Sequence, residues 1–191
     1  LSSTSFRWLN WIGHVLVKNV EIEIGGQRID KHYGDWLHIW NELTQSAGHQ
    51  VGYASMVGNV PRLTQPVSGS GTIPETVLYI PLQFWFCRNP GLALPLIALQ
   101  YHEVKINLDI RNIEECLWAV SAIDGTGTKV TDAYKQSLAA ASLFVDYIFL
   151  DTDERRRMAQ NPHEYLIEQL QFTGDESVGS SSNKIKLNLN H

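Results

Sequence analysis

Residues 16–33 read LVKNVEIEIGGQRIDKHY, and this stretch decides the fold class. Its first half alternates in polarity from Leu16 to Ile24, as a strand with one buried face does. One face holds Leu16, Val20, Ile22 and Ile24, and the other holds Val17, Asn19, Glu21 and Glu23. Gly25-Gly26 follows at once and supplies the positive φ angles of a tight turn. Gln27–Tyr33 is then the expected returning strand, so the stretch predicts an antiparallel hairpin.

The period of two recurs along the rest of the chain. Further strands are expected at Val77–Phe86, His102–Ile110, Ser142–Leu150 and Lys184–Leu189, with a weaker signal at Leu166–Phe172. In His102–Ile110 the apolar side chains, expected in the core, are Val104, Ile106, Leu108 and Ile110. Ser142–Leu150 is apolar on both faces except at Asp146, which predicts a strand covered on both sides.

Helical signals are short and lie between these strands. Asp35 is a candidate N-cap for a helix over Trp36–Thr44, with Trp36, Leu37, Trp40 and Leu43 against a sheet. Residues 151–154 predict a cap for Glu154–Gln160, and a third short helix is expected from Pro95. Residues 57–76, 124–131 and 174–183 are rich in loop-forming residues. The fold class predicted is all-β, an antiparallel jelly-roll sandwich with short helices in the connecting loops.

Composition argues against several functional classes. The 191 residues carry 15 Lys and Arg against 20 Asp and Glu, a net charge of −5, which disfavours direct nucleic-acid binding. Cys87 and Cys116 lack metal-ligand spacing and are expected to be buried free thiols. No apolar stretch approaches the roughly 20 residues of a membrane span. Both ends of the chain look cut, since it begins at Leu1 and stops directly after a strand signal.

Three motifs carry a resemblance to a known family. They are VEIEIGGQRIDKHYGDW at residues 20–36, IPLQFWFCRNPG followed by LPLIAL at residues 80–91 and 94–99, and LNLNH at residues 187–191. These motifs resemble the major capsid proteins of chloroviruses, iridoviruses and related large DNA viruses. The resemblance covers nearly all of the chain.

The resemblance implies a structural protein of the virion, assembled in the host cytoplasm. In such a subunit two jelly rolls stand side by side, and three subunits form a pseudo-hexagonal capsomer of an icosahedral shell. Residues 1–191 would be the N-terminal jelly-roll domain, the first half of a double jelly roll, without the one or two strands before Ser5 and without the second jelly roll. The implied partners are identical subunits, neighbouring capsomers and minor capsid proteins, with an inner viral membrane nearby and no direct contact with nucleic acid. Ser142–Leu150 is the expected contact with the second jelly roll.

Two other functional classes stay open at this point. Glu103 and Asp109 share a strand face, as the carboxylates of a jelly-roll glycoside hydrolase would, although Lys105 and Arg111 on that face favour an ion-paired outer surface. A lectin-like module could use tryptophans, but they are spread along the chain at Trp8, Trp11, Trp36, Trp40, Trp85 and Trp118.

The remaining polar motifs have simple structural explanations. His32 and His38 are expected on a loop and a helix surface, and His102 and Glu103 point to opposite faces. Arg155-Arg156-Arg157 is expected to be a solvated face. We therefore expect no catalytic residues, no cofactor-binding residues, no metal ligands and no cofactor.

Overall fold

The computed structural model describes residues 5–68, 71–121, 138–181 and 184–189. The strands are β1 (Ser5–Trp8), β2 (Val17–Ile24), β3 (Gln27–Tyr33), β4 (Val67–Ser68), β5 (Val104–Ile110) and β6 (Leu117–Val120). The helices are α1 (Ile12–Leu16), α2 (Gly34–Thr44), α3 (Gln50–Val57), α4 (Pro61–Thr64), α5 (Trp85–Arg88), α6 (Ile113–Cys116) and α7 (Thr152–Gln160), with a 3₁₀ turn η1 (Pro90–Leu92). Within these ranges every helix is too short or too polar to cross a membrane.

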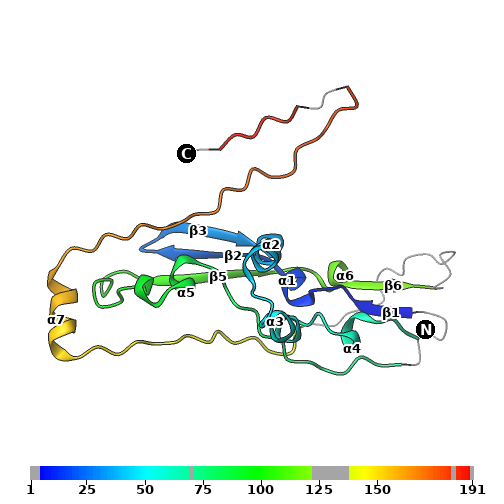
Figure 1. Cartoon of the computed structure of the whole chain (residues 1–191), viewed down its shortest axis with the longest axis horizontal. Helices are drawn as coiled ribbons and strands as arrows, with labels where there is room; N and C mark the ends of the chain where they lie inside the picture. Colours follow the sequence, from blue (N-terminus) through cyan, green and yellow to red (C-terminus); the bar gives the residue numbers. More distant parts are fainter. Residues whose placement is uncertain (1–4, 69–70, 122–137, 182–183, 190–191) are drawn as a thin grey trace.

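The strands form two antiparallel sheets of three strands each. One sheet has the order β3-β2-β5 and the other the order β4-β1-β6. In Figure 1 the two sheets lie toward opposite ends of the long axis, and α1 leads from β1 to β2 between them. Of the predicted all-β jelly-roll sandwich, the structure shows the coarser part, antiparallel sheets with short helices in the connections.

The hairpin of the first motif forms as predicted. Ile24 pairs with Gln27, so the loop is the two glycines alone, with φ of 61° at Gly25 and 81° at Gly26. Positive φ at both loop positions is the geometry that matches the twist of the flanking strands. A side chain at Gly25 would also contact the ring of His102, so the turn is closed on one side by the loop before β5.

The alternation in β2 breaks at one point. The pairing of β2 with β5 shifts register between Val17 and Asn19, which leaves Lys18 unpaired in this ladder. Val17 is therefore buried in the same cluster as Val20 and Ile22, although the sequence placed it on the opposite face. An alternating sequence pattern does not reveal such a bulge. One extra residue in a strand moves the side chains beyond it to the opposite face of the sheet.

Two clusters of buried side chains make the core. The larger lies on the β3-β2-β5 sheet and contains Val17, Val20, Ile22, Leu37, Phe84 and Trp85. The smaller contains Ile12, Leu63 and Cys116, beside α1, α4 and α6. The two sheets thus bury their apolar residues in separate clusters.

Strand β5 is only half covered. Val104 and Ile106 pack against the larger cluster, as predicted. Leu108 and Ile110 were expected in the core as well, but they are 47% and 43% exposed. Because β5 is an edge strand of its sheet, the alternation set the direction of its side chains without ensuring their burial.

Several predicted strands lack a ladder. Residues 77–84 are extended, with Leu78 and Ile80 half-buried and Val77 and Tyr79 exposed, so the alternation is seen without a paired strand. Residues 142–150, 166–172 and 184–189 are likewise not strands. An isolated strand is not stable without a neighbour to accept and donate its backbone hydrogen bonds. Of the predicted loops, residues 124–131 lie outside the described residues.

Two of the three predicted helices form at the expected positions, but the cap and the buried face of the first differ from the prediction. Helix α2 begins at Gly34 with Tyr33 as N-cap, so Asp35 lies in the first turn and does not cap. Leu37 is fully buried, whereas Leu43, expected against the sheet, is 75% exposed. Helix α7 is capped as predicted, because Asp151 Oδ1 accepts a hydrogen bond from Glu154 N at 2.8 Å. The helix expected from Pro95 is instead a run of turns.

Gly34 offers a stringent test of this packing. A Cβ at this position would overlap the backbone oxygens of His14 and Val17, which cannot move without shifting α1 against β2. We expect Gly34→Ala to destabilise the protein by about 3 kcal/mol or more, at the upper end of overpacking effects. Denaturant unfolding of the full-length protein measures this.

A matched control lies in a neighbouring helix. A methyl group added at Gly52 in α3 would meet no atom within 4 Å, so Gly52→Ala should be neutral or stabilising by up to about 1 kcal/mol. Equal effects of the two variants would contradict the close approach at Gly34.

Candidate interaction surface

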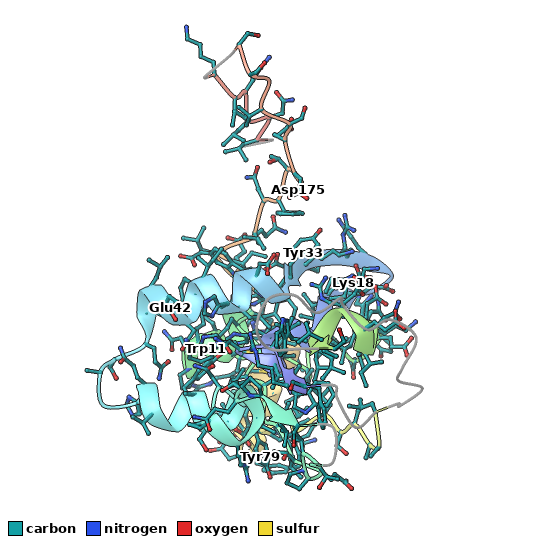
Figure 2. All side chains as sticks on the ribbon, turned by 90° about the vertical axis from the view of Figure 1, so that its right-hand side faces the viewer. Trp11, Lys18, Tyr33, Glu42, Tyr79 and Asp175 are labelled. Carbon is teal, nitrogen blue, oxygen red and sulfur yellow. The ribbon has the colours of Figure 1, made fainter. Side chains whose placement is uncertain are left out.

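A long extended segment runs along one side of the body. Residues 138–151 follow this side to α7 at the end of the molecule, and the chain then returns along the other side past β3 (Figure 1). The ring of Phe144 lies 6.4 Å from that of Tyr79, so two extended segments without ladders lie beside each other. Figure 2 places Tyr79 at the end of the body opposite to Asp175, where the returning chain projects away.

This segment exposes its apolar side chains on both faces. Phe149 is 93% and Phe144 81% exposed. The other large apolar side chains that are exposed here are Leu143, Val145, Tyr147 and Ile148. The predicted strand, covered on both sides, is therefore wrong for this chain: neither the ladder nor the cover is present. A contiguous apolar surface of this kind is typical of a contact with further protein.

The chain after α7 makes a second contact with the body. Gln169 Nε2 donates to the carbonyl oxygen of Ile29, and Leu170 N donates to Asp30 Oδ1 at 3.1 Å. The Phe172 ring lies 4.4 Å from that of Tyr33. The weakly predicted strand at 166–172 thus lies along the free edge of β3 without pairing as a strand.

The two candidate hydrolase carboxylates do not form a catalytic pair. Glu103 and Asp109 are six residues apart along an extended strand, which separates them by about 20 Å at 3.3 Å per residue. Glycosidase carboxylates lie within about 10 Å of each other. Glu103 pairs instead with Lys105 at 3.1 Å, which raises the pKa of that lysine, and Asp109 accepts a hydrogen bond from Asn19 at 2.9 Å. The polar outer surface predicted for this face is confirmed for these residues.

The three histidines that the sequence singled out lie in separate environments. His32 is buried in β3 with Nε2 3.0 Å from Asp30 Oδ2, so its expected place on a loop is wrong. His38 is half-buried on α2, and His102 is exposed beside the hairpin. Among the residues that the structure describes, no three His, Cys, Asp or Glu side chains gather to hold a metal ion.

One histidine lies in an aromatic cluster that the sequence did not indicate. His14 is 2% exposed, its Nε2 lies 2.8 Å from Tyr53 Oη, and its ring stacks on Trp11. In Figure 2 Trp11 lies between α2 and α3. Burial, with a smaller effect of His38, lowers the pKa of His14 to about 4, and burial raises the pKa of Tyr53 to about 12. No sequence signal could join these residues, because His14 and Tyr53 are 39 positions apart.

The remaining candidates separate into buried and exposed groups. Trp85 is buried, Trp8 and Trp118 belong to the β4-β1-β6 sheet, and Trp36 and Trp40 lie on α2. The tryptophans therefore do not line one groove. The three consecutive arginines of α7 are exposed, as predicted for a solvated face.

The two cysteines differ in environment. Cys116 is a buried free thiol, as predicted, and burial raises its pKa to about 11. Cys87 is also free, but it is exposed, so the prediction of a buried thiol is wrong there.

Comparison with known proteins identifies the family. The family described as major capsid protein N-terminus matches residues 2–151, which is most of the chain. The chain belongs to the major capsid protein family. The resemblance carried by the three sequence motifs is thereby confirmed.

Relatives within the family are similar over almost the whole chain. The major capsid protein of Phaeocystis pouchetii virus is 74% identical over 205 residues, covering 97% of this chain and 39% of that protein. The major capsid protein of Paramecium bursaria Chlorella virus 1 is 44% identical over 181 residues, covering 92% of this chain and 38% of that protein. The chain therefore spans about two fifths of the length of these relatives.

Solved capsid structures are similar as well. A quasi-atomic model of the PBCV-1 virus capsid matches with a TM-score of 0.66 and 38% sequence identity, covering 98% of this chain and 45% of the other. The exposed segment at 138–150 lies within residues 2–151, the part of the chain that the family model matches.

The buried histidine makes stability depend on pH. The folded-state pKa of His14, about 4, lies below its ordinary value of 6.5, so the unfolded state binds more protons between these values. The contribution of neutral His14 to the free energy of unfolding is therefore fully present above pH 6.5, and it is lost as the pH falls toward 4. At about 1.4 kcal/mol per pKa unit this is up to about 3 kcal/mol.

Denaturant unfolding from pH 7.5 to 4 measures the effect. We expect His14→Gln to flatten the profile between pH 6.5 and 4, since glutamine can still bond to Tyr53 but does not titrate. The exposed His163 gives the control, and His163→Gln should keep the profile of the unmodified protein. Identical profiles for all three proteins would exclude His14 as the source.

Proposed function

We propose that this chain forms part of a major capsid protein subunit that builds trimeric, pseudo-hexagonal capsomers of an icosahedral virus shell. Its membership of the major capsid protein family carries the proposal. On this proposal the protein works by assembly in the virion and has no catalytic role, as part of the shell of a large DNA virus.

The exposed apolar segment supports a double jelly roll. Residues 143–149 carry large apolar side chains on both faces. An exposed apolar surface of this kind marks a contact with further protein. The relatives are more than twice as long as the part that this chain matches. We assign the cover to a second jelly roll of the same subunit, packed beside the first.

The partners follow from the same proposal. Identical subunits would form the trimer, neighbouring capsomers and minor capsid proteins would contact its sides, and an inner viral membrane would lie below it. Assembly would take place in the host cytoplasm. The net charge of −5 supports a subunit that does not bind nucleic acid directly.

The decisive experiment is to determine the assembly state of the full-length protein. Sedimentation should give the mass of a trimer, and electron microscopy should show particles with a pseudo-sixfold outline. A stable monomer that cleaves or captures glycans would overturn the proposal in favour of the hydrolase or the lectin.

The two carboxylates provide a direct test of the hydrolase alternative. We expect the double variant Glu103→Gln, Asp109→Asn to assemble into the same trimers, because Asp109 can be replaced by another acceptor for Asn19. Neither protein should release sugar from a panel of oligosaccharides. Hydrolysis by the unmodified protein that disappears in the variant would support an enzyme.

Phe149 tests whether the apolar segment is covered in the full-length protein. Its side chain is 93% exposed in this chain. If it is equally exposed in the full-length protein, Phe149→Ala should change the free energy of unfolding by less than about 0.5 kcal/mol. Under the second jelly roll the same change should cost about 3–5 kcal/mol, the usual effect of removing a buried phenylalanine. Thermal or denaturant unfolding of the full-length protein distinguishes the two.

Val51 on α3 is the matched control. It is 83% exposed and lies outside the segment, so Val51→Ala should be nearly silent. If neither Phe149→Ala nor Val51→Ala changes the stability of the full-length protein, residues 138–150 are not covered there. The second jelly roll would then have to pack elsewhere.

A further inference from the structure

Helix α7 takes no part in the core. It joins two extended segments at one end of the body, and none of its residues is buried (Figure 1). It has only nine residues, whereas isolated helices shorter than about 12–15 residues are marginal in water. Most helices in proteins are stabilised by packing of an apolar face. That cause is absent here, so the helix must be held in another way.

Local contacts at both ends keep α7 formed. Asp151 Oδ1 accepts a hydrogen bond from Glu154 N in the first turn, and His163 Nε2 donates to the carbonyl oxygen of Met158 at 2.7 Å. Acidic residues occupy the first turn and Arg157 the last, which the helix dipole favours. The helix is therefore formed before any partner arrives, and a partner that binds it does not have to order it.

The surface that α7 presents is cationic. Three of the eight arginines of the chain are consecutive here, at positions 155–157, and all three are exposed. Successive residues lie about 100° apart around a helix, so Arg155 and Arg157 flank Arg156. Arg156 lies 3.7 Å from Asp153, but both side chains are exposed, and such pairs are weak. Arg155 and Arg157 form no ion pair with any residue that the structure describes.

The charge of the chain indicates what such a surface would bind. Arginine is suited to carboxylates, which it can engage with two parallel hydrogen bonds. Helix α7 contains three positive and two negative charges, and the whole chain has a net charge of −5, so the residues outside α7 sum to −6. A second copy of this chain therefore offers an acidic surface. Two copies of α7 would repel each other, so that surface lies outside the α7 of the second copy.

Nucleic acid and anionic lipid fit α7 less well. Segments that bind an anionic membrane carry dense positive charge, about 4–8 Lys and Arg. In α7 three arginines follow directly on Asp153 and Glu154, with Asp151 at the cap. Met158 is the one large apolar residue of the helix, so α7 also lacks the apolar face of a helix that lies in a membrane interface. A protein partner is favoured.

We propose that α7 docks through its arginines on an acidic surface of a second copy of this protein. The inference rests on the proposed function. In a pseudo-hexagonal capsomer of three double jelly rolls, each first jelly roll has a second jelly roll on both sides, so this contact joins adjoining capsomers. Salt screens exposed charges beyond about 8 Å at physiological ionic strength. The association of trimers should therefore weaken as salt rises, while the trimers stay intact.

The triple variant Arg155→Gln, Arg156→Gln, Arg157→Gln of the full-length protein tests the docking. Glutamine keeps a similar helix propensity and removes the charge, and no buried residue is changed. Sedimentation at low ionic strength should show trimers of both proteins. The trimers of the variant should associate with each other at least about tenfold more weakly than those of the unmodified protein.

A matched control removes the same number of exposed positive charges elsewhere, by Lys18→Gln, Arg62→Gln and Lys186→Gln. Its trimers should associate like those of the unmodified protein. Equal association of all three proteins, equal weakening in both variants, or an unmodified protein that stays trimeric at every concentration would overturn the docking and leave the proposed function standing. An unmodified protein that forms no trimers would overturn the proposed function and this inference with it.

A conservative variant identifies the partner. Arg155→Lys with Arg157→Lys keeps the charges and supplies amines that a carbodiimide joins to carboxylates at ion-pair distance. In a mixture of preformed trimers, some isotopically labelled and some not, crosslinks should join α7 to Asp or Glu of the other kind of chain. Crosslinks confined to one kind would overturn the proposal. So would binding of oligodeoxythymidine or of phosphatidylserine vesicles that the glutamine variant loses, since the arginines would then serve a polyanion.

Discussion

The pairing of β2 on both of its edges is the constraint on which the rest of the structure depends. This strand bonds to β3 through the hairpin and to β5 through residues far along the chain. Val20 and Ile22 at its centre are 1% and 0% exposed, and they share a buried cluster with Leu37 of α2 and with Phe84, which directly precedes α5. Removing β2 would take away both ladders and the floor of the larger core. The bulge at Lys18 is part of this arrangement, because it turns Val17 into the same cluster.

How much the sequence could predict depended on how local each structure is. The course of the hairpin was predictable, because a two-glycine loop and an alternating strand are both properties of contiguous chain, whereas the bulge at Lys18 was not. The cap at Asp151 was predictable for the same reason. By contrast, residues 77–84 and 142–150 have strand-like alternation but no ladder, since a ladder needs a partner that the local pattern does not specify.

The surface features differ in how far the sequence alone could predict them. The apolar character of residues 142–150 was visible in the sequence. The pattern predicted burial of both faces, but the side chains of this segment are exposed in this chain. The ion pair of Arg88 with Glu168, 2.8 Å long, was not visible at all. Arg88 and Glu168 are 80 positions apart, and neither lies in a motif that suggests a ligand site. The resemblance to the family was visible in the motifs, which encode packing and turns rather than chemistry, and the family match over residues 2–151 confirmed it.

The connectivity of the central sheet also sets an order of events during synthesis. The hairpin of β2 and β3 closes through a two-residue loop, whereas Asn19 and Asp109, which join β2 to β5, are 90 positions apart. Loops that close over short separations form in microseconds, long before a ribosome adds the intervening residues. The hairpin can therefore be complete while β5 is still untranslated, with one edge of β2 unpaired for several seconds. A nascent strand edge in that condition attracts other unfolded chains, so crowded translation of this protein favours protection by a chaperone until β5 arrives.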